Sequence, residues 1–300
     1  MDIQALICFA EVAKRGNYTR AAETLYLSQP QCTRIIKNLE RELDIKLINR
    51  TSKAFSLTDA GIAFYHEAEK LIQSYNDIFR IVEDVRDCNI GEVRFSSPGV
   101  LLDMYFPTVL NQFSEKYPEI TFNIKEEGSK LTAMSVLNNE AELGMVMLPI
   151  QSSSQFVIKT VIQDVCKLVV RKDHPFAGRS TVNIKELIDE RIITFGDTTT
   201  LHNSFINMCE IEGFMPNITY KSMMPNFIFD MVSLGKCIAV LPYPLIQHCI
   251  TENMATVLLE PIFYWDIALI HKKDRYQSFA ARKVLDFMYD YFEKLQSQKF

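Results

Sequence analysis

Several patterns that would assign this chain to a common class of protein are missing from its sequence. No apolar run reaches the ~18 residues that a membrane-spanning helix needs, and no charged start followed by an apolar core marks a secretion signal. The motifs GxSxG, GxGxxG and HExxH and the Walker loop, which mark several classes of enzyme, are also absent. We therefore expect a cytoplasmic protein that does not enter a membrane, with no catalytic residues.

The seven cysteines show no pattern of a metal site or of a disulfide framework. They are odd in number and widely spaced, with no CxxC pair and no Cys/His cluster at zinc-like spacing. Nothing in the sequence marks one of them as a reactive thiol of low pKa. We expect reduced, buried side chains, and neither a metal nor a resident cofactor.

The charges are unevenly distributed along the 300 residues, whose net charge is −5. Residues 1–58 hold nine basic and six acidic side chains, a net charge of +3, whereas the remaining residues carry −8. A basic front joined to an acidic body is expected when only the front meets a polyanion. The distribution indicates a nucleic-acid-binding segment at the start of the chain.

The first sixty residues predict two short helices joined by a tight turn. Leu6 and Phe9 lie one helical turn apart, and Gly16 follows as a C-terminal cap. The stretch NYTRAAETLYLS then offers Thr19 as the N-cap of a second helix, with small alanines that permit close packing. Only three or four residues separate this helix from the next, which is typical of a helix-turn-helix.

Residues 28–43 predict a helix with one apolar and one basic side. Ser28 and Gln31 fit a capping box, so Pro30 falls in the first turn, where its missing N–H costs little. The apolar side holds Cys32, Ile35, Ile36, Leu39 and Leu43, and the opposite side holds Pro30, Arg34, Lys37 and Arg41, flanked by Thr33 and Asn38. A solvated charged face is the ordinary interpretation. The lack of acidic residues on that side and the helix that precedes it favour a DNA-recognition helix instead.

The segment KLINRTSKAFSLTDAG predicts a two-stranded wing with Arg50 and Lys53 near its tip. Basic tips with small hydroxyl residues suit contacts with phosphates or the minor groove. The side chains that we expect to contact DNA are Thr19, Arg20, Ser28, Gln29, Pro30, Thr33, Arg34, Lys37, Arg50 and Lys53.

The submotifs AAETL, LSQP, LERELDIKLINR and LTDAG, in this order and spacing, closely resemble the N-terminal winged helix-turn-helix of LysR-type transcriptional regulators. Two positions depart from the family pattern: Thr33 stands where a serine is common, and Ile48 replaces the usual phenylalanine. The resemblance implies a regulator that binds double-stranded promoter DNA.

Apolar residues in the next segment repeat every seven positions, as in a coiled coil. They are Phe64, Ala68, Leu71, Tyr75, Ile78, Val82 and Val85. A helix packed on its own domain is the alternative, but little of its own chain remains to cover this seam. We expect a homodimer through this helix, and the family likeness favours a tetramer over a dimer.

The remaining two hundred residues alternate between strand and helix patterns, which indicates an α/β fold with largely parallel sheets. Strands are expected near 93–96, 120–124, 143–147, 192–195, 218–221 and 238–241, and helices near 101–116, 129–139, 199–212, 225–234 and 276–295. The stretches FPTVLNQFSEKYPEI, AELGMVM and MVSLGKCIAVLP resemble the LysR-type effector domain, which is built like a periplasmic solute-binding protein.

The patterns and the resemblance together divide the chain into three parts. Residues 1–58 form the winged helix-turn-helix, 59–88 the linker and dimerisation helix, and 91–300 the effector-binding domain. By the likeness, subdomain I comprises 91–161 and 266–300, and subdomain II comprises 162–265.

Ligands of open α/β folds bind at the carboxyl ends of strands, where helix N-termini suit an anion. The segments SSPG and GDTTT follow two predicted strands, so we expect a small-molecule effector there, with an anionic group. Plain helix caps are the alternative, and the methionines named below fit a buried core equally well. The expected contacts are Ser96, Ser97, Pro98, Gly99, Met147, Asp197, Thr198, Thr199, Thr200, His202 and Met223.

Two other functions stay open at this point. A DNA-binding regulator or architectural protein without an effector would keep the helix-turn-helix and need no cleft. A solute-binding protein or an enzyme of the α/β class would need a catalytic constellation or a secretion signal, and it leaves the basic front unexplained.

Overall fold

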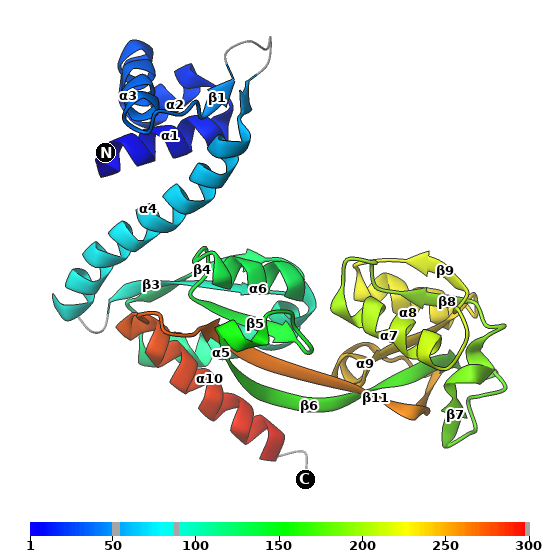
Figure 1. Ribbon diagram of the computed structural model, residues 1–300. Helices are drawn as coiled ribbons and strands as arrows, with labels where there is room; N and C mark the ends of the chain where they lie inside the picture. The colour runs from blue at the N-terminus through cyan, green and yellow to red at the C-terminus, as the bar shows by residue number, and fades with distance from the viewer. Residues whose placement is uncertain (50–54, 87–89, 298–300) are drawn as a thin grey trace. The chain divides into compact units, whose positions relative to one another are not determined.

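The computed structural model describes residues 1–49, 55–86 and 90–297, which form two compact units, Met1–Asp87 and Cys88–Phe300 (Figure 1). The first unit contains α1 (Ile3–Arg15), α2 (Tyr18–Thr24), α3 (Gln29–Glu42), β1 (Ile48–Asn49), β2 (Ser56–Leu57) and α4 (Asp59–Arg86). Helix α4 thus belongs to the same compact unit as the helix-turn-helix, with which it shares contacts through α1.

Caps fix the ends of the first three helices. Gly16 ends α1 in the left-handed region with φ of 60°, which confirms the predicted C-cap. The predicted N-cap of α2 is wrong: Asn17 caps this helix, because its Oδ1 accepts hydrogen bonds from the backbone N–H groups of Thr19 and Arg20 at 2.8 and 3.1 Å. Thr19 therefore lies inside the first turn of α2.

Helix α3 begins with the predicted capping box. The side chain of Gln31 accepts from the Ser28 N–H at 2.9 Å, and the Gln31 N–H donates to the Ser28 hydroxyl at 3.4 Å. Cys32, Ile36 and Leu39 are buried in the core of the unit. The apolar side of the helix is thereby confirmed.

Helix α4 runs without a break through 28 residues. At its start, a β-carbon at Gly61 would overlap the carbonyl oxygen of Leu47, so only glycine permits this close approach. The Phe64 ring packs edge-on against Phe9 at 5.3 Å between centroids, and Ala68 is buried. The first part of the predicted seam therefore packs on its own unit.

The second unit is one mixed sheet covered by helices. Its elements are β3 (Gly91–Ser97), α5 (Gly99–Lys116), β4 (Ile120–Glu126), α6 (Ser129–Leu137), β5 (Leu143–Met147), η1 (Ser153–Gln155), β6 (Phe156–Arg171), β7 (Thr181–Asn183), η2 (Ile184–Leu187), β8 (Ile192–Thr194), α7 (Thr200–Ile211), β9 (Ile218–Lys221), α8 (Pro225–Ser233), β10 (Ile238–Pro242), α9 (Tyr243–Cys249), β11 (Met254–Lys272) and α10 (Phe279–Ser297).

The strand order is β4-β3-β5-β11-β6-β10-β8-β9, with β7 paired to β11. Pairing is parallel among β4, β3 and β5 and among β10, β8 and β9. Between these groups, β6 and β11 pair antiparallel over most of their length. The expectation of largely parallel sheets holds within each group and is wrong at the centre, where two long strands were not expected.

Strands β6 and β11 join two subdomains, each built on one parallel group (Figure 1). Subdomain I contains β3–β5 with α5, α6 and α10, and subdomain II contains β7–β10 with α7–α9. The positions where the sequence placed the crossings, near 162 and 266, lie inside these two strands. The chain therefore passes from one subdomain to the other within a continuous strand at both crossings.

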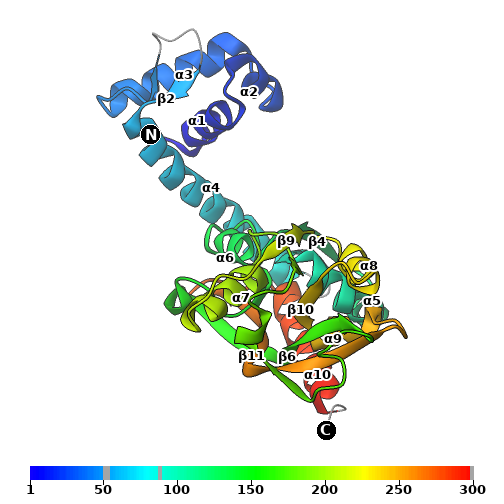
Figure 2. The same cartoon turned by 90° about the vertical axis from the view of Figure 1, so that its right-hand side faces the viewer.

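The C-terminal helix α10 returns to subdomain I, where it packs against α5, β3 and β6 (Figure 2). Phe292 of this helix is fully buried and meets the Tyr105 ring of α5 edge-on at 5.4 Å. The last helix of the chain thus completes the core of the first subdomain.

Candidate functional site

The outward side of α3 forms a basic surface in the first unit. Arg34, Lys37 and Arg41 are exposed, and within the described part of the chain none of them is held in an ion pair. At the start of the helix, the Thr33 hydroxyl donates to the Gln29 carbonyl at 3.0 Å and accepts from the Gln29 side chain at 3.2 Å. Free cations and hydrogen-bonding side chains thus share one side of the helix.

The other residues expected at DNA are distributed around this surface. Thr19 and Arg20 are exposed in the first turn of α2, and Gln29 and Pro30 are exposed in the first turn of α3. Ser28 is exposed, and its hydroxyl is engaged in the capping box. The wing residues Arg50 and Lys53 lie outside the described residues.

A buried carboxylate holds the far end of α3 to the wing. Glu40 is 2% exposed and accepts hydrogen bonds from the N–H groups of Leu47 and Ile48 at 3.0 and 3.3 Å. Lys46 donates to its other oxygen at 3.1 Å. Burial alone would raise the pKa of Glu40, but these donors together lower it.

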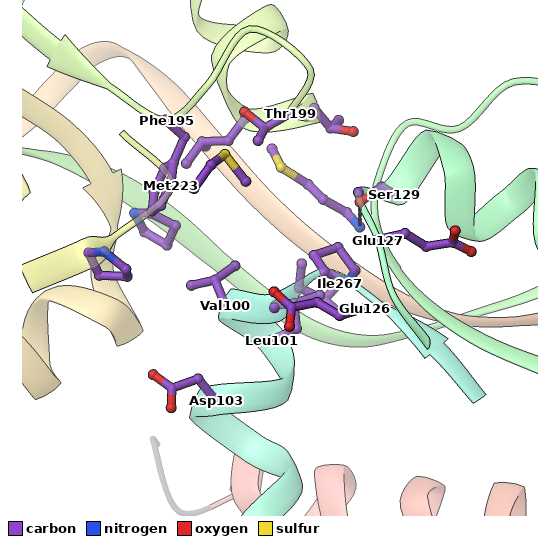
Figure 3. Close-up of a pocket in the computed structure, with 18 of the residues that line it drawn as sticks. Val100, Leu101, Asp103, Glu126, Glu127, Ser129, Phe195, Thr199, Met223 and Ile267 are labelled. Carbon is purple, nitrogen blue, oxygen red and sulfur yellow. Dashed lines mark hydrogen bonds between the residues drawn. The ribbon is translucent and has the colours of Figure 1, made fainter. Parts of the chain in front are cut away.

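A cavity of about 530 Å³ opens between the two subdomains of the second unit (Figure 3). The subdomains approach each other beside it, where a β-carbon at Gly128 would lie 3.7 Å from the carbonyl oxygen of Thr198. The cavity is lined by Pro98, Gly99, Val100, Leu101, Asp103, Glu126, Glu127, Gly128, Ser129, Met147, Phe195, Thr199, Thr200, Leu201, Met223, Met224, Pro225, Asn226, Pro242, Trp265 and Ile267. Its size is that of a small-molecule site.

Six of the residues predicted from the sequence line this cavity: Pro98, Gly99, Met147, Thr199, Thr200 and Met223. The first three come from subdomain I and the last three from subdomain II. The structure therefore brings the two predicted segments SSPG and GDTTT to opposite walls of one cavity.

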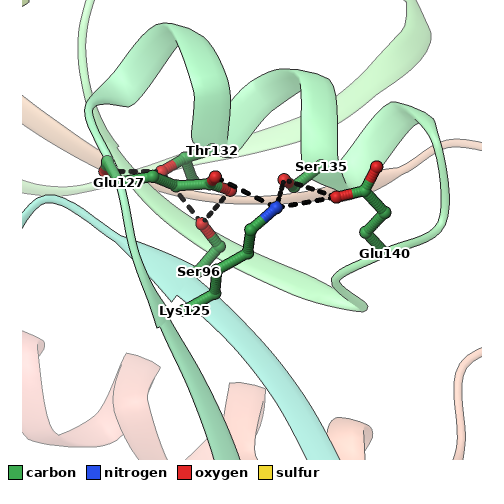
Figure 4. Close-up of polar contacts among 6 residues, drawn as sticks. All are labelled: Ser96, Lys125, Glu127, Thr132, Ser135 and Glu140. Atoms are coloured by element: carbon green, nitrogen blue, oxygen red, sulfur yellow. Dashed lines mark hydrogen bonds and ion pairs between the residues drawn. The ribbon is translucent and has the colours of Figure 1, made fainter. Parts of the chain in front are cut away.

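Ser96 and Ser97 do not line the cavity, because both are fully buried behind its wall. The Ser96 hydroxyl donates to Glu127 Oε1 at 2.9 Å and lies 3.1 Å from the Thr132 hydroxyl (Figure 4). The Ser97 hydroxyl donates to the Pro98 carbonyl at 3.4 Å. The two serines support the cavity wall from behind through these hydrogen bonds, and they are not placed to contact a ligand.

Asp197, Thr198 and His202 also lie outside the lining of this cavity. Asp197 pairs with Lys221 at 3.0 Å, which lowers the pKa of the aspartate. Thr198 faces a neighbouring cavity of about 430 Å³ between α6 and α7. His202 is buried with Nδ1 2.9 Å from the Thr194 hydroxyl, and burial, followed by the charge of Lys221, lowers the pKa of its imidazole.

Thr199 serves as the N-cap of α7. Its hydroxyl accepts from the His202 N–H at 3.3 Å and donates to the Gly196 carbonyl at 2.7 Å. These bonds set the conformation of the turn that closes the cavity on the side of subdomain II. The interpretation of this segment as a helix cap is therefore confirmed, and Thr199 also lines the cavity.

The acidic and aromatic residues of the lining were not among those predicted from the sequence. Asp103 and Glu126 contribute carboxylates, Glu127 is also part of the lining, and Phe195 and Trp265 contribute rings. Among the described residues, no lysine or arginine lines the cavity, so an anionic effector finds no cationic side chain there. Glu126 is the last residue of β4 and Glu127 follows it, so the rule that selected SSPG and GDTTT would have selected them as well.

The described residues offer neither a membrane-spanning helix nor a metal site. None of their helices has the length and apolar character of a membrane span. No group of three or more His, Cys, Asp or Glu side chains among them is arranged to hold a metal ion.

Residues 3–62 match the helix-turn-helix of bacterial regulatory proteins of the lysR family, and residues 88–293 match the LysR substrate binding domain. An uncharacterised HTH-type transcriptional regulator of Bacillus subtilis, YwbI, is 36% identical over 95% of each chain. The transcriptional dual regulator GltC of the same species is 25% identical over 99% of each chain.

Solved structures share the fold. A full-length OxyR variant from Pseudomonas aeruginosa matches with a TM-score of 0.71 and 19% identity, over 98% of this chain and 95% of that one. Full-length CbnR, solved in complex with its target DNA, matches with a TM-score of 0.64 and 19% identity, over 96% and 99%. With its helix-turn-helix unit and its two-subdomain effector-binding domain, the chain belongs to the LysR family of transcriptional regulators.

Proposed function

We propose that this chain binds promoter DNA through α3 and that a small molecule in the cavity between the subdomains controls the complex. The observation that carries the first part is the basic side of α3, which has no ion-pair partner among the described residues and whose N-terminal turns are capped and exposed. A structure of the same fold, CbnR, binds target DNA. The second part rests on the cavity, whose two walls come from different subdomains.

The residues of α3 take different roles in this proposal. Arg34 lies near the N-terminal end, where the side chains of a recognition helix reach base edges, and its guanidinium suits the two acceptors of guanine. Lys37 lies one turn further along the same side and suits phosphate contact, which positions the protein and carries no base information.

Control by the effector requires two arrangements of the assembly that bind it with different affinity. We place the assembly contact on α4, where Leu71 and Ile78 are 53% and 57% exposed. Val82 and Val85, the last members of the predicted seam, have side chains outside the described set. A homodimer formed through this helix, and a tetramer built from two dimers, would carry several copies of α3 to one operator.

We also propose that the chain has no enzymatic activity and that it works in the cytoplasm, where the promoter DNA lies. The support for this is the kinship with transcriptional regulators and a cavity whose lining offers no nucleophile held beside a base.

Selection of bound genomic fragments by the purified chain would yield the operator. Arg34→Ala should then weaken operator binding by about 1–3 kcal/mol, roughly 5- to 150-fold, with a smaller loss on unrelated DNA. Arg282→Ala, which removes an exposed arginine of the second unit, serves as the control. Unchanged operator affinity of Arg34→Ala would contradict the assignment of this helix side.

The effector part is tested by thermal unfolding of the full chain across a metabolite library. We expect a few compounds to stabilise the chain, since a ligand that binds only the folded state raises its stability. A library in which nothing stabilises the chain would favour a regulator that works without an effector.

A further inference from the structure

The cavity between the subdomains combines an apolar wall with unpaired negative charge. Phe195, Trp265 and Ile267 are largely buried and present rings and an aliphatic side chain to it. Asp103 and Glu126 are exposed at its edge, on or beside the first turns of α5 (Figure 3). A ligand that fills this space meets both surfaces.

The Glu126 carboxylate occupies the place where the sequence put the anion of an effector. Gly99 is the first residue of α5, and a β-carbon there would overlap Oε1 of Glu126. The N-cap residue Pro98 supplies no side-chain hydrogen bond to this helix. The partial positive charge of the helix N-terminus therefore already faces a carboxylate of the chain itself. An anionic ligand would have to displace that carboxylate or lie against it.

Glu127 plays a different part, although it lines the same cavity. Its carboxylate points away from the cavity, toward α6 (Figure 3). There Ser96 donates to Oε1 at 2.9 Å and Lys125 pairs with Oε2 at 3.1 Å (Figure 4). Lys125 also pairs with Glu140 at 2.7 Å. The ammonium group of Lys125 is thus shared between two carboxylates behind the wall and does not neutralise Glu126.

Within the described part of the chain, neither the Asp103 nor the Glu126 carboxylate has a hydrogen-bond or ion-pair partner. The cavity consequently keeps two carboxylates that a ligand can pair with. A cation placed beside them gains Coulomb energy and charge-assisted hydrogen bonds. A ligand anion there meets like charge.

We propose that the effector is an organic cation, such as a primary amine, joined to an apolar or aromatic body. The ammonium group lies against Glu126, with Asp103 adding to the negative potential. The body packs against Phe195 and Trp265, whose ring faces also favour a nearby cation. Met223, 62% exposed at the rim, is an unbranched side chain that adapts to the shape of the body. This assignment rests on the proposed function, in which the cavity is the effector site.

The test compares three probes of similar shape and different charge on the full chain by titration calorimetry: 2-phenylethylamine, 2-phenylethanol and 3-phenylpropanoate. The amine should bind about tenfold more tightly than the alcohol, as one charge-assisted hydrogen bond predicts, and the carboxylate should bind most weakly. Glu126→Gln should remove the advantage of the amine. Glu119→Gln, which changes an exposed carboxylate just before the other end of β4, should leave it intact.

Two outcomes would overturn the proposal: a carboxylate probe that binds as tightly as the amine, or an amine preference that survives in Glu126→Gln. If the carboxylate binds and Met147→Trp, which fills the cavity, abolishes that binding, the assignment of charge fails while the effector site stands. If none of the three probes binds and no library compound stabilises the chain, the effector site fails with it.

Discussion

Single residues decide how firmly the DNA-binding unit is held together, and Glu40 is the main example. Its carboxylate accepts two backbone N–H bonds from the wing segment while almost fully buried. Such a group stabilises the fold most while it is charged, because protonation weakens the bonds from its N–H donors and removes the attraction to Lys46.

Glu40→Gln should lower the free energy of unfolding by about 2–3 kcal/mol at neutral pH. The pKa of Glu40 is lowered in the folded state, so this contribution is fully present above the pKa of the unfolded chain. It is lost as the pH falls through the lower, folded pKa. Urea unfolding at a series of pH values should therefore show the difference between variant and parent shrinking toward acid. A difference independent of pH would assign the loss to packing alone.

Two cysteines meet in the same core. The sulfur atoms of Cys8 and Cys32 lie 3.0 Å apart between α1 and α3, and both side chains are buried. Burial raises the pKa of both thiols. The burial expected from the sequence is confirmed for these two side chains, and their reduced state stays a prediction.

Iodoacetamide should alkylate these two thiols far more slowly in the folded chain than in urea at neutral pH, because the thiolate is the reactive form. Peptide mass spectrometry reports each site separately, and the partly exposed Cys249 serves as an internal comparison. Equal rates for Cys32 in the folded and unfolded chain would show that α3 opens readily.

At the scale of elements, the sequence predicts helix ends and faces best where one local rule acts. The capping box at Ser28 and the left-handed Gly16 depend on neighbours within a few residues, and both were predictable. Asn17 and Thr19 are both residue types that cap helices, with asparagine the better of the two, and the backbone of the structure selects the asparagine.

The long strands β6 and β11 could not be predicted from a local rule of this kind. Their residues change neighbours as they pass from one subdomain to the other, so no single alternation of apolar and polar side chains runs through them. Pro261 and the register shift between Leu258 and Phe263 also interrupt β11, and proline argues against a central strand.

Gly61→Ala should destabilise the first unit, since the new methyl group would overlap the Leu47 carbonyl and push α4 away from the wing. We expect a loss of about 1–3 kcal/mol, typical of overpacking, measured by thermal unfolding. Ala63→Gly, at an exposed position of the same turn, separates this steric effect from helix propensity. A Gly61→Ala variant as stable as the parent would show that α4 shifts freely.

Leu71→Glu combined with Ile78→Glu should weaken self-association of the chain, because both side chains are exposed on one side of α4. Sedimentation velocity at a series of concentrations measures the effect. His66→Glu, exposed on the same helix outside the seam, provides the control. A double variant that associates as strongly as the parent would place the contact elsewhere.

At the scale of the whole molecule, the sequence could predict the division into a DNA-binding and an effector-binding part, because composition and motif order differ between them. It could also predict which segments meet at the cavity, since strand ends in parallel sheets converge. The same rule points to Glu126 and Glu127, but it does not tell which of the two carboxylates faces the cavity. Whether Glu126 faces the cavity and Glu127 the network depends on a single step along the backbone after β4.

The place of β11 in the sheet sets the order in which the effector-binding unit can be completed during synthesis. This strand is made after residue 253, yet it lies between β5 and β6 in the middle of the sheet. Until it leaves the ribosome, β5 and β6 have no neighbour between them, and α10 is still to be made. Subdomain I is therefore the first part of the unit to be made and the last to be completed, so in a nascent chain the edge of β5 that β11 will cover stays open while the whole of subdomain II is translated.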